Sequence, residues 1–309
     1  MKKLFVSLIF TLLLSIIILI TILSTIGIET SKFNEIIREK ISEKKNINLD
    51  LKSIKFKIDP KKLSLFLETE DPNINYLDLT IPVQNLKVYT DVLSLFSSSP
   101  KINKINLLLK ELDITQLNNL SKLIKPSNFK SFINNKIKDG KLISEIEIFL
   151  DDKGNFQDFI AKGKVRDLRA ELLSNLNLTK INLSFFADKN DILVKNIFGN
   201  FEDIKISNGD VKLNLENGIK VSSNFNSNIK LNKKLLNKYE RFYKQNNLLT
   251  QFNIVEGNFN NNFSIAFDET YKMIDYNYNI SGNLNKGEFV LLEAIENEII
   301  KEKIKKVYF

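Results

Sequence analysis

Strict alternation of apolar and polar residues is the feature that most limits what this chain can fold into. It is clearest in the stretch IKISNGDVKLNLENGIKV, which occupies positions 204–221. Successive side chains of a β-strand point to opposite faces of a sheet, so a two-residue period predicts strands with one apolar and one polar face. The residues assigned to the apolar face are Ile204, Ile206, Val211, Leu213, Leu215, Ile219 and Val221.

Two Asn-Gly pairs interrupt this stretch. Asn-Gly between two alternating runs is the strongest short signal for a β-hairpin. At Asn208-Gly209, a two-residue loop pairs Ile206 with Val211, apolar against apolar. We therefore predict a tight hairpin turn at this position.

The second Asn-Gly pair requires a different loop. A two-residue loop here would place Leu215 opposite Lys220, on the same face. A three-residue loop over 216–218 places Leu215 opposite Ile219 and keeps the faces distinct. We therefore predict a bulged turn with Gly218 in the left-handed region.

The same period recurs along most of the chain from residue 47 onward. A second clean example is IDYNYNISGNL (274–284), whose apolar side is formed by Ile274, Tyr276, Tyr278 and Ile280. Helical periods are short and are expected at 30–46, near Asp91, near Gln116, and at 127–137, 232–245 and 288–300. The expected fold is mainly β with a few helices, in which a curled antiparallel sheet forms an elongated groove.

The N-terminal segment is of a different kind. Residues Leu4 to Ile28 carry no charge over 25 positions. That is long enough to cross a bilayer. Lys2 and Lys3 precede the segment, so the positive-inside rule places the N-terminus in the cytoplasm and the rest of the chain across the membrane. The alternative is a cleaved signal peptide, but no A-x-A-like cleavage motif follows.

Composition excludes several classes of function. The chain has no Cys and no His, which removes thiolate chemistry, disulfides and His-based catalysis. The net charge of +8 is spread along the chain and forms no basic stripe, so no nucleic-acid partner is expected. No nucleotide-binding or nucleophile motif is present. We therefore expect neither an enzyme nor a cofactor, and interpret the pair Asp151-Asp152 as turn residues.

The chain resembles the AsmA-like family of Gram-negative envelope proteins, which includes the TamB and YhdP types. The resemblance rests on the N-terminal anchor, the segment SKFNEIIREKISEK after it, and the basic alternating strand INLDLKSIKFKI (47–58). The run from Phe159 to Leu213 looks like the cadence of the family's repeating strands. Such proteins are often much longer, so this chain is similar to a short member or an N-terminal fragment.

The resemblance implies a function. An inner-membrane protein with a periplasmic β-groove would assist phospholipid transport or outer-membrane assembly, with phospholipid, the inner membrane and other envelope proteins as partners. The groove candidates are the eleven apolar residues of 204–221 and 274–280 named above. The expected division is an anchor at 1–28, an α+β region at 29–126 and a β-rich groove region at 127–309.

Three alternatives remain open from the sequence. The apolar faces could close into an anchored β-sandwich that serves as an envelope scaffold. The alternating strands and terminal Phe309 are also typical of an outer-membrane β-barrel, although 300–309 does not alternate cleanly. The third alternative is a periplasmic enzyme on a β scaffold.

Overall fold

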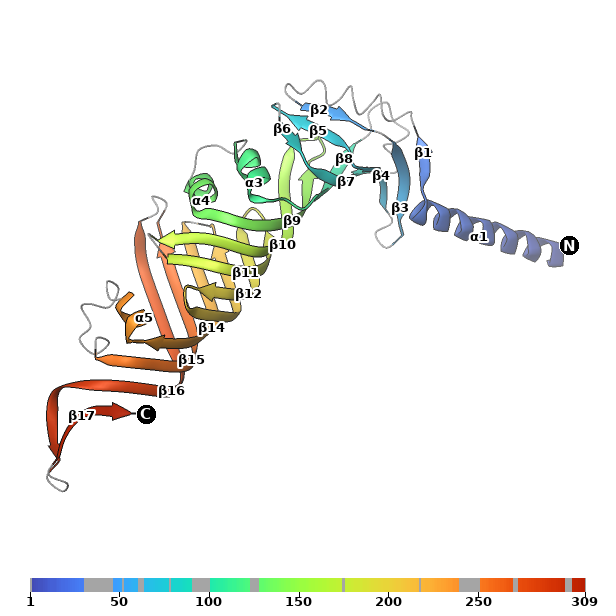
Figure 1. The fold of residues 1–309 in the computed structure, drawn as a ribbon. Helices are drawn as coiled ribbons and strands as arrows, with labels where there is room; N and C mark the ends of the chain where they lie inside the picture. Colours follow the sequence, from blue (N-terminus) through green and yellow to red (C-terminus); the bar gives the residue numbers. More distant parts are fainter. Residues whose placement is uncertain are drawn as a thin grey trace. The chain divides into compact units, whose positions relative to one another are not determined.

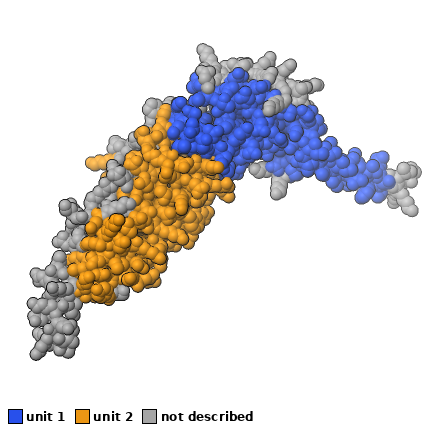
Figure 2. Space-filling view, in the orientation of Figure 1, with its two compact units in different colours: residues 1–125, 143–163 blue, residues 126–142, 164–309 orange. Residues whose placement is uncertain are grey.

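The computed structural model describes residues 2–30, 47–51, 53–60, 64–77, 79–90, 101–122, 128–173, 176–216, 218–238, 251–268, 272–297 and 302–308. The chain forms two compact units, coloured separately in Figure 2. Unit 1 comprises Met1–Lys125 and Ile143–Gly163, and unit 2 comprises Pro126–Leu142 and Lys164–Phe309. The sequence-based division at 126 did not anticipate that residues 143–163 belong with unit 1.

The fold class predicted from the sequence is confirmed, because the chain is mainly β with a few helices and a large antiparallel sheet (Figure 1). The N-terminal helix α1 (Lys2–Thr25) is followed directly by strand β1 (Ile28–Thr30). Within α1, Phe5–Thr25 is long and apolar enough to span a membrane, with a mean hydropathy of 3.0. The helix predicted at 30–46 lies almost entirely outside the described residues.

The remaining elements divide between the units. In unit 1 the large sheet contains β1, β3 (Ile54–Asp59), β4 (Ser64–Glu70), β7 (Val83–Thr90) and β8 (Ile102–Leu109). A small sheet contains β2 (Ile47–Asp50), β5 (Asn73–Tyr76) and β6 (Leu79–Ile81), and helix α3 spans Ile114–Ser121. Strands β9 (Ile137–Leu150) and β10 (Phe156–Leu173) have residues in both units.

Unit 2 is a meander in which each strand is followed by its antiparallel neighbour. Its strands are β11 (Leu176–Ala187), β12 (Asp191–Phe201), β13 (Ile204–Asn214), β14 (Ile219–Asn232), β15 (Phe252–Phe267), β16 (Met273–Asn297) and β17 (Glu302–Tyr308). Helix α4 (Asn128–Lys136) confirms the prediction at 127–137, and α5 covers Lys233–Lys238. The helix predicted over 288–300 is wrong, because β16 continues to Asn297 and pairs with β17 there.

Unit 1 has a closed hydrophobic core. The register aligns Phe56 with Leu67, Leu67 with Val88 and Val88 with Ile105, so apolar residues form one continuous face of the large sheet. Phe56, Val88 and Ile105 are partly exposed, but many residues on that face and on the segments near it are less than 9% exposed, which is the burial expected of a packed interior. They include Leu49, Leu51, Ile54, Leu65, Leu67, Val83, Leu86, Leu109 and Leu112.

The opposite face of unit 1 carries a charged cluster around Glu68, whose side chain is 9% exposed. The ammonium nitrogen of Lys57 lies 2.6 Å from Oε2 of Glu68, that of Lys87 lies 3.4 Å from Oε1, and Asn85 donates a hydrogen bond to Oε1 at 3.0 Å. Burial raises the pKa of Glu68, but the hydrogen bonds from Lys57 and Asn85 and the nearby positive charges outweigh it. The pKa of Glu68 therefore lies below its ordinary value.

The hairpin predicted at Asn208-Gly209 is wrong. Strand β13 runs straight through both residues, and the turn before it lies at 202–203, where Glu202 has a φ of 51°. Asn208 has a φ of 50° and sits in a β-bulge, since the pairing with β14 shifts by one residue between Ser207 and Asp210. A bulge and a tight hairpin turn both need a residue that tolerates positive φ, so Asn-Gly alone does not distinguish them.

The second turn matches its prediction. Gly218 has a φ of 99°, in the left-handed region that favours glycine. The pairs Leu213–Val221 and Asn214–Lys220 show the register that a three-residue loop requires.

Bulges also lie next to one another in β11, β12 and β13 of unit 2. Asn196 in β12 has a φ of 56°, and its backbone N–H donates to Oδ1 of Asp210 at 3.2 Å. Its side-chain amide donates to Oγ of Ser184 at 3.3 Å. Bulges increase the twist of a strand and bend it, which accounts for the curled strands of this unit in Figure 1.

We expect the charge of Glu68 to stabilise unit 1 in a pH-dependent manner. Because its pKa is lowered in the folded state, this stabilisation is present above the unfolded-state pKa and is lost as pH falls through the folded-state pKa. Glu68→Gln should lower the opening free energy of the β4 amides by about 2 kcal/mol at neutral pH. The loss should shrink below about pH 4, as measured by hydrogen exchange. Glu70→Gln is the control, since that carboxylate is 66% exposed; an equal loss in both variants would contradict the account.

Candidate functional site

The structure places all eleven candidate residues on or beside three strands of unit 2. Seven belong to the β13–β14 hairpin and four to β16. Leu213 lies opposite Val221, Val221 opposite Ile265, and Ile265 opposite Tyr276. Directly opposed residues of neighbouring strands share a face, so both sequence stretches contribute to one apolar surface.

Parallel rows extend this surface. Val211 lies opposite Ser223, Ser223 opposite Phe263, and Phe263 opposite Tyr278. On the other side of β13, strand β12 adds Ile192 and Val194, which pair with Leu213 and Val211. We call this surface of β12–β16 the apolar face. Its members are the eleven candidates together with Ile192, Val194, Phe225, Phe259, Phe263 and Ile265.

The bulge at Asn208 keeps the two halves of β13 on the same face. Ile206 pairs with Ser227 and Val211 with Ser223. These serines are four residues apart on β14, whose pairing with β15 has no shift, so they share a face. Without the extra residue, Ile206 and Val211 would point to opposite faces because their numbers differ by five. The bulge thus keeps Ile206 and Val211 on one face, as the predicted hairpin would also have done.

Strand β15 supplies side chains that the sequence analysis missed. Phe259, Phe263 and Ile265 alternate with Asn260, Asn262 and Ser264, so the two-residue signal was present in FNNNFSIAF (259–267). The rings of Phe225 and Phe263 meet edge to face with centroids 6.3 Å apart. These aromatic rings lie on the strand between the two groups of candidates.

Burial separates this face from the core of unit 1. None of the eleven candidates is less than 9% exposed. On β13 and β14 they are half-buried, apart from Leu215 at 39%, whereas Ile274, Tyr276, Tyr278 and Ile280 on β16 are 57–69% exposed. A closed sandwich would bury such residues at both inner faces. Among the residues that the structure describes, no second sheet completes a core over this face.

The other side of the same strands is built from amides and hydroxyls. Asn224 donates to Oδ1 of Asn262 at 2.6 Å, and Asn228 donates to Oδ1 of Asn258 at 2.7 Å. Asn260 donates to Asn226 at 3.0 Å, so the amides form cross-strand ladders. These bonds use polar side chains that would otherwise bind only water.

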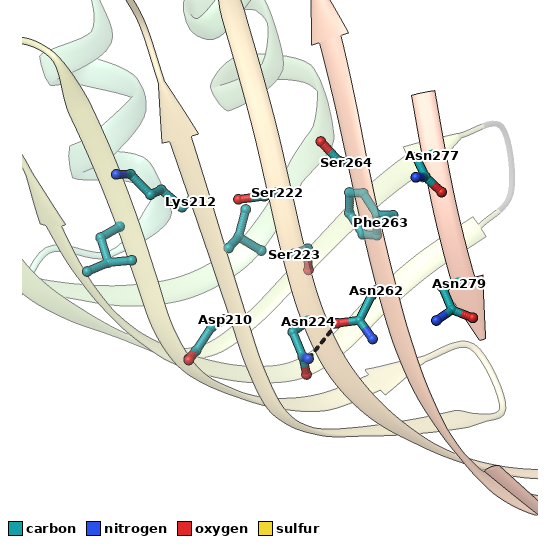
Figure 3. A pocket seen from close by; sticks show the side chains of 12 residues that line it. Asp210, Lys212, Ser222, Ser223, Asn224, Asn262, Phe263, Ser264, Asn277 and Asn279 are labelled. Carbon is teal, nitrogen blue, oxygen red and sulfur yellow. Dashed lines mark hydrogen bonds between the residues drawn. The ribbon is translucent and has the colours of Figure 1, made fainter. Parts of the chain in front are cut away.

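An open hollow of about 450 Å³ lies on this polar side (Figure 3). Its lining residues are Asp210, Lys212, Ser222, Asn224, Asn262, Ser264, Asn277 and Asn279, together with Leu193, Val211, Ser223 and Phe263. Val211, Ser223 and Phe263 also belong to the rows of the apolar face, so side chains from both faces of the sheet border the hollow.

The part of the chain that the structure describes contains no group of three or more Asp or Glu side chains that could hold a metal ion. No family model matches the chain, and no curated protein or solved structure gives a significant match.

We expect charged substitutions to separate the apolar face from a packed core. Ile181 on β11 is 2% exposed, so Ile181→Asp should cost several kcal/mol of stability. Tyr278→Asp should cost less than about 1 kcal/mol because the aspartate stays in water, and Leu213→Asp should fall between. Thermal unfolding of the detergent-solubilised chain measures all three. A loss for Tyr278→Asp as large as that for Ile181→Asp would show that Tyr278 lies in a closed core.

Proposed function

We propose that this chain is an inner-membrane protein of the AsmA-like type that binds phospholipid acyl chains on its apolar face. In this role it assists phospholipid transport or outer-membrane assembly in a Gram-negative envelope. Helix α1 is the anchor, with the N-terminus in the cytoplasm and the chain that follows α1 in the periplasm. The observation that carries the proposal is an apolar face across five strands on which no candidate side chain is fully buried.

The size of the face suits an acyl chain. Five strands about 4.8 Å apart give a width of roughly 19 Å. One leaflet of a bilayer has a hydrocarbon thickness of about 15 Å. An acyl chain laid across β12–β16 would therefore cover about four of the five strands. Each buried methylene contributes about 0.8 kcal/mol, so partial burial of one chain is enough for reversible binding.

The chemistry of the face suits a neutral, non-directional ligand. Its side chains are aliphatic or aromatic, with Ser223, Ser227 and Asn261 as the polar exceptions in the central rows. The amide of Asn261 is already used, since it donates to the backbone oxygen of Phe225 and to Oγ of Ser227. This leaves a surface that repels water and selects no particular head group.

The second candidate is an anchored β-sandwich that acts as an envelope scaffold without lipid transfer. It requires a partner layer that buries the apolar face. The burial pattern favours the lipid proposal, but both share the anchor and differ only in what covers the face.

Strand alternation provides a matched test. A benzophenone side chain at Val221 would project from the apolar face, and the same group at Ser222 would project from the polar face one residue away. We expect ultraviolet irradiation in vesicles of phosphatidylethanolamine and phosphatidylglycerol to label phospholipid at Val221 several-fold more than at Ser222. Phe263 and Asn262 form a second pair on β15 with the same expectation.

Equal labelling within both pairs would show that the faces do not differ in access to lipid. Absence of label at Val221 and Phe263, in a chain that remains folded and inserted, would leave the scaffold as the better account.

A further inference from the structure

The junction between helix α1 and the sheet of unit 1 contains no linker. Only Ile26 and Gly27 separate the end of α1 from the start of β1 (Figure 1). The backbone N–H groups of both residues donate to the carbonyl oxygen of Ile22, at 3.0 and 2.9 Å, so they cap the helix. The next residue, Ile28, already pairs with Phe56 of β3. The apolar helix and the first strand of the sheet therefore form one continuous piece.

The last turn of α1 also packs against unit 1, to which the helix belongs. Leu23 is 8% exposed, whereas the large apolar side chains of the earlier turns are 39–68% exposed. Lys57 of β3 lies against Gly27, where a Cβ would come within 2.7 Å of the lysine Cγ. The ammonium nitrogen of Lys57 is in turn fixed 2.6 Å from Oε2 of Glu68. These contacts hold the helix end and β3 together.

Two isoleucines continue the apolar surface of α1 beyond the end of the helix. Ile26 is 69% exposed and Ile28 is 51% exposed, and both adjoin the exposed apolar side chains of α1. Water around such side chains is unfavourable. A contiguous exposed apolar surface marks a contact with a membrane or with a partner. Here the surface continues a helix that is apolar along its whole length, which favours the membrane.

The length of α1 places these isoleucines at the boundary of a bilayer. Phe5–Thr25 has 21 residues. At about 1.5 Å per residue it is roughly 32 Å long, close to the hydrocarbon thickness of about 30 Å. The head-group layer outside the hydrocarbon is roughly 5–8 Å thick. The three residues from Ile26 to Ile28 reach at most about 10 Å even when fully extended, and the hydrogen bonds to Ile22 shorten that reach. Both isoleucines therefore lie within or beside the head-group layer.

We propose that Ile26 and Ile28 insert into the leaflet from which α1 emerges and bind the β1–β3 end of unit 1 to the phospholipid surface. The occupant of this surface is the bilayer that holds the helix. Unit 1 is then seated on the membrane and does not swing on a tether. The proposal rests on the anchor of the proposed function, but it does not depend on lipid binding by the apolar face of unit 2.

Tryptophan fluorescence tests this contact, because the chain contains no tryptophan of its own. The full-length chain with Ile28→Trp is reconstituted into vesicles of phosphatidylethanolamine and phosphatidylglycerol. The vesicles also contain phosphatidylcholine brominated either near the head group or near the chain end, and bromine quenches tryptophan only on close approach. An exposed position accepts the larger ring, and tryptophan is itself common at membrane interfaces.

Two further single-tryptophan variants are the controls. Leu14→Trp lies on α1, at a position that is 48% exposed, and reports the interior of the bilayer. Phe156→Trp lies at a position of unit 1 that is 60% exposed, on β10, which β3, β4, β7, β8 and β9 separate from β1 in the strand order. It is matched to Ile28→Trp in exposure and reports contact that is not specific to the junction.

We expect bromine near the head group to quench Ile28→Trp several-fold more than bromine near the chain end. The order should be reversed for Leu14→Trp, and Phe156→Trp should be quenched by neither lipid. If Leu14→Trp is quenched and Ile28→Trp is not, the junction lies outside the bilayer or under protein, and the proposal is wrong. Equal quenching of Ile28→Trp and Phe156→Trp would overturn it as well, because the contact would not be specific to the junction.

These outcomes are separate from lipid labelling at Val221. Ile28→Trp can be quenched while the apolar face takes no lipid, and the face can take lipid while Ile28→Trp is not quenched. Absence of quenching for Leu14→Trp would contradict the anchor itself, and this proposal with it.

Discussion

The need to remove an apolar sheet face from water governs this structure. Strand alternation places every second side chain on one face, and that face must be covered by protein or by a ligand. Unit 1 meets the requirement internally, with Ile54 and Val83 each 1% exposed. Unit 2 has a surface of the same character on β12–β16, but the apolar side chains assigned to that surface are all at least 9% exposed. The same sequence pattern thus produces a core in one unit and a partly exposed apolar face in the other.

The bulged strands of unit 2 keep this surface continuous. Residues in the left-handed region, such as Asn196 and Asn208, absorb an extra residue without exchanging the two faces. Gly199 on β12 also has a positive φ, of 152°. A Cβ at this position would lie 2.8 Å from the backbone oxygen of Lys180. The curvature of the sheet and the integrity of its apolar face therefore depend on the same few positions.

Much of this could be predicted from the sequence, because alternation and a long uncharged segment are local signals. The strands at 204–221 and 274–284 and the left-handed Gly218 follow from side-chain period and turn chemistry alone. The turn at Asn208-Gly209 and the helix over 288–300 were wrong because pairing with distant strands decides between structures of equal local preference. The return of 143–163 to unit 1 is likewise non-local. The two-residue period is the same for a buried face and for an exposed one, so the sequence does not show how deeply a face is buried.

The central claim is that lipid covers the apolar face, and native mass spectrometry tests it most directly. The full chain would be extracted from its membrane in a mild detergent, and its co-purified lipids would be identified and counted. The account predicts phospholipid bound to the wild-type protein, and its loss from a folded variant with aspartate at Leu213 and Ile265. A folded wild-type protein without phospholipid, or undiminished phospholipid on the variant, would contradict the account.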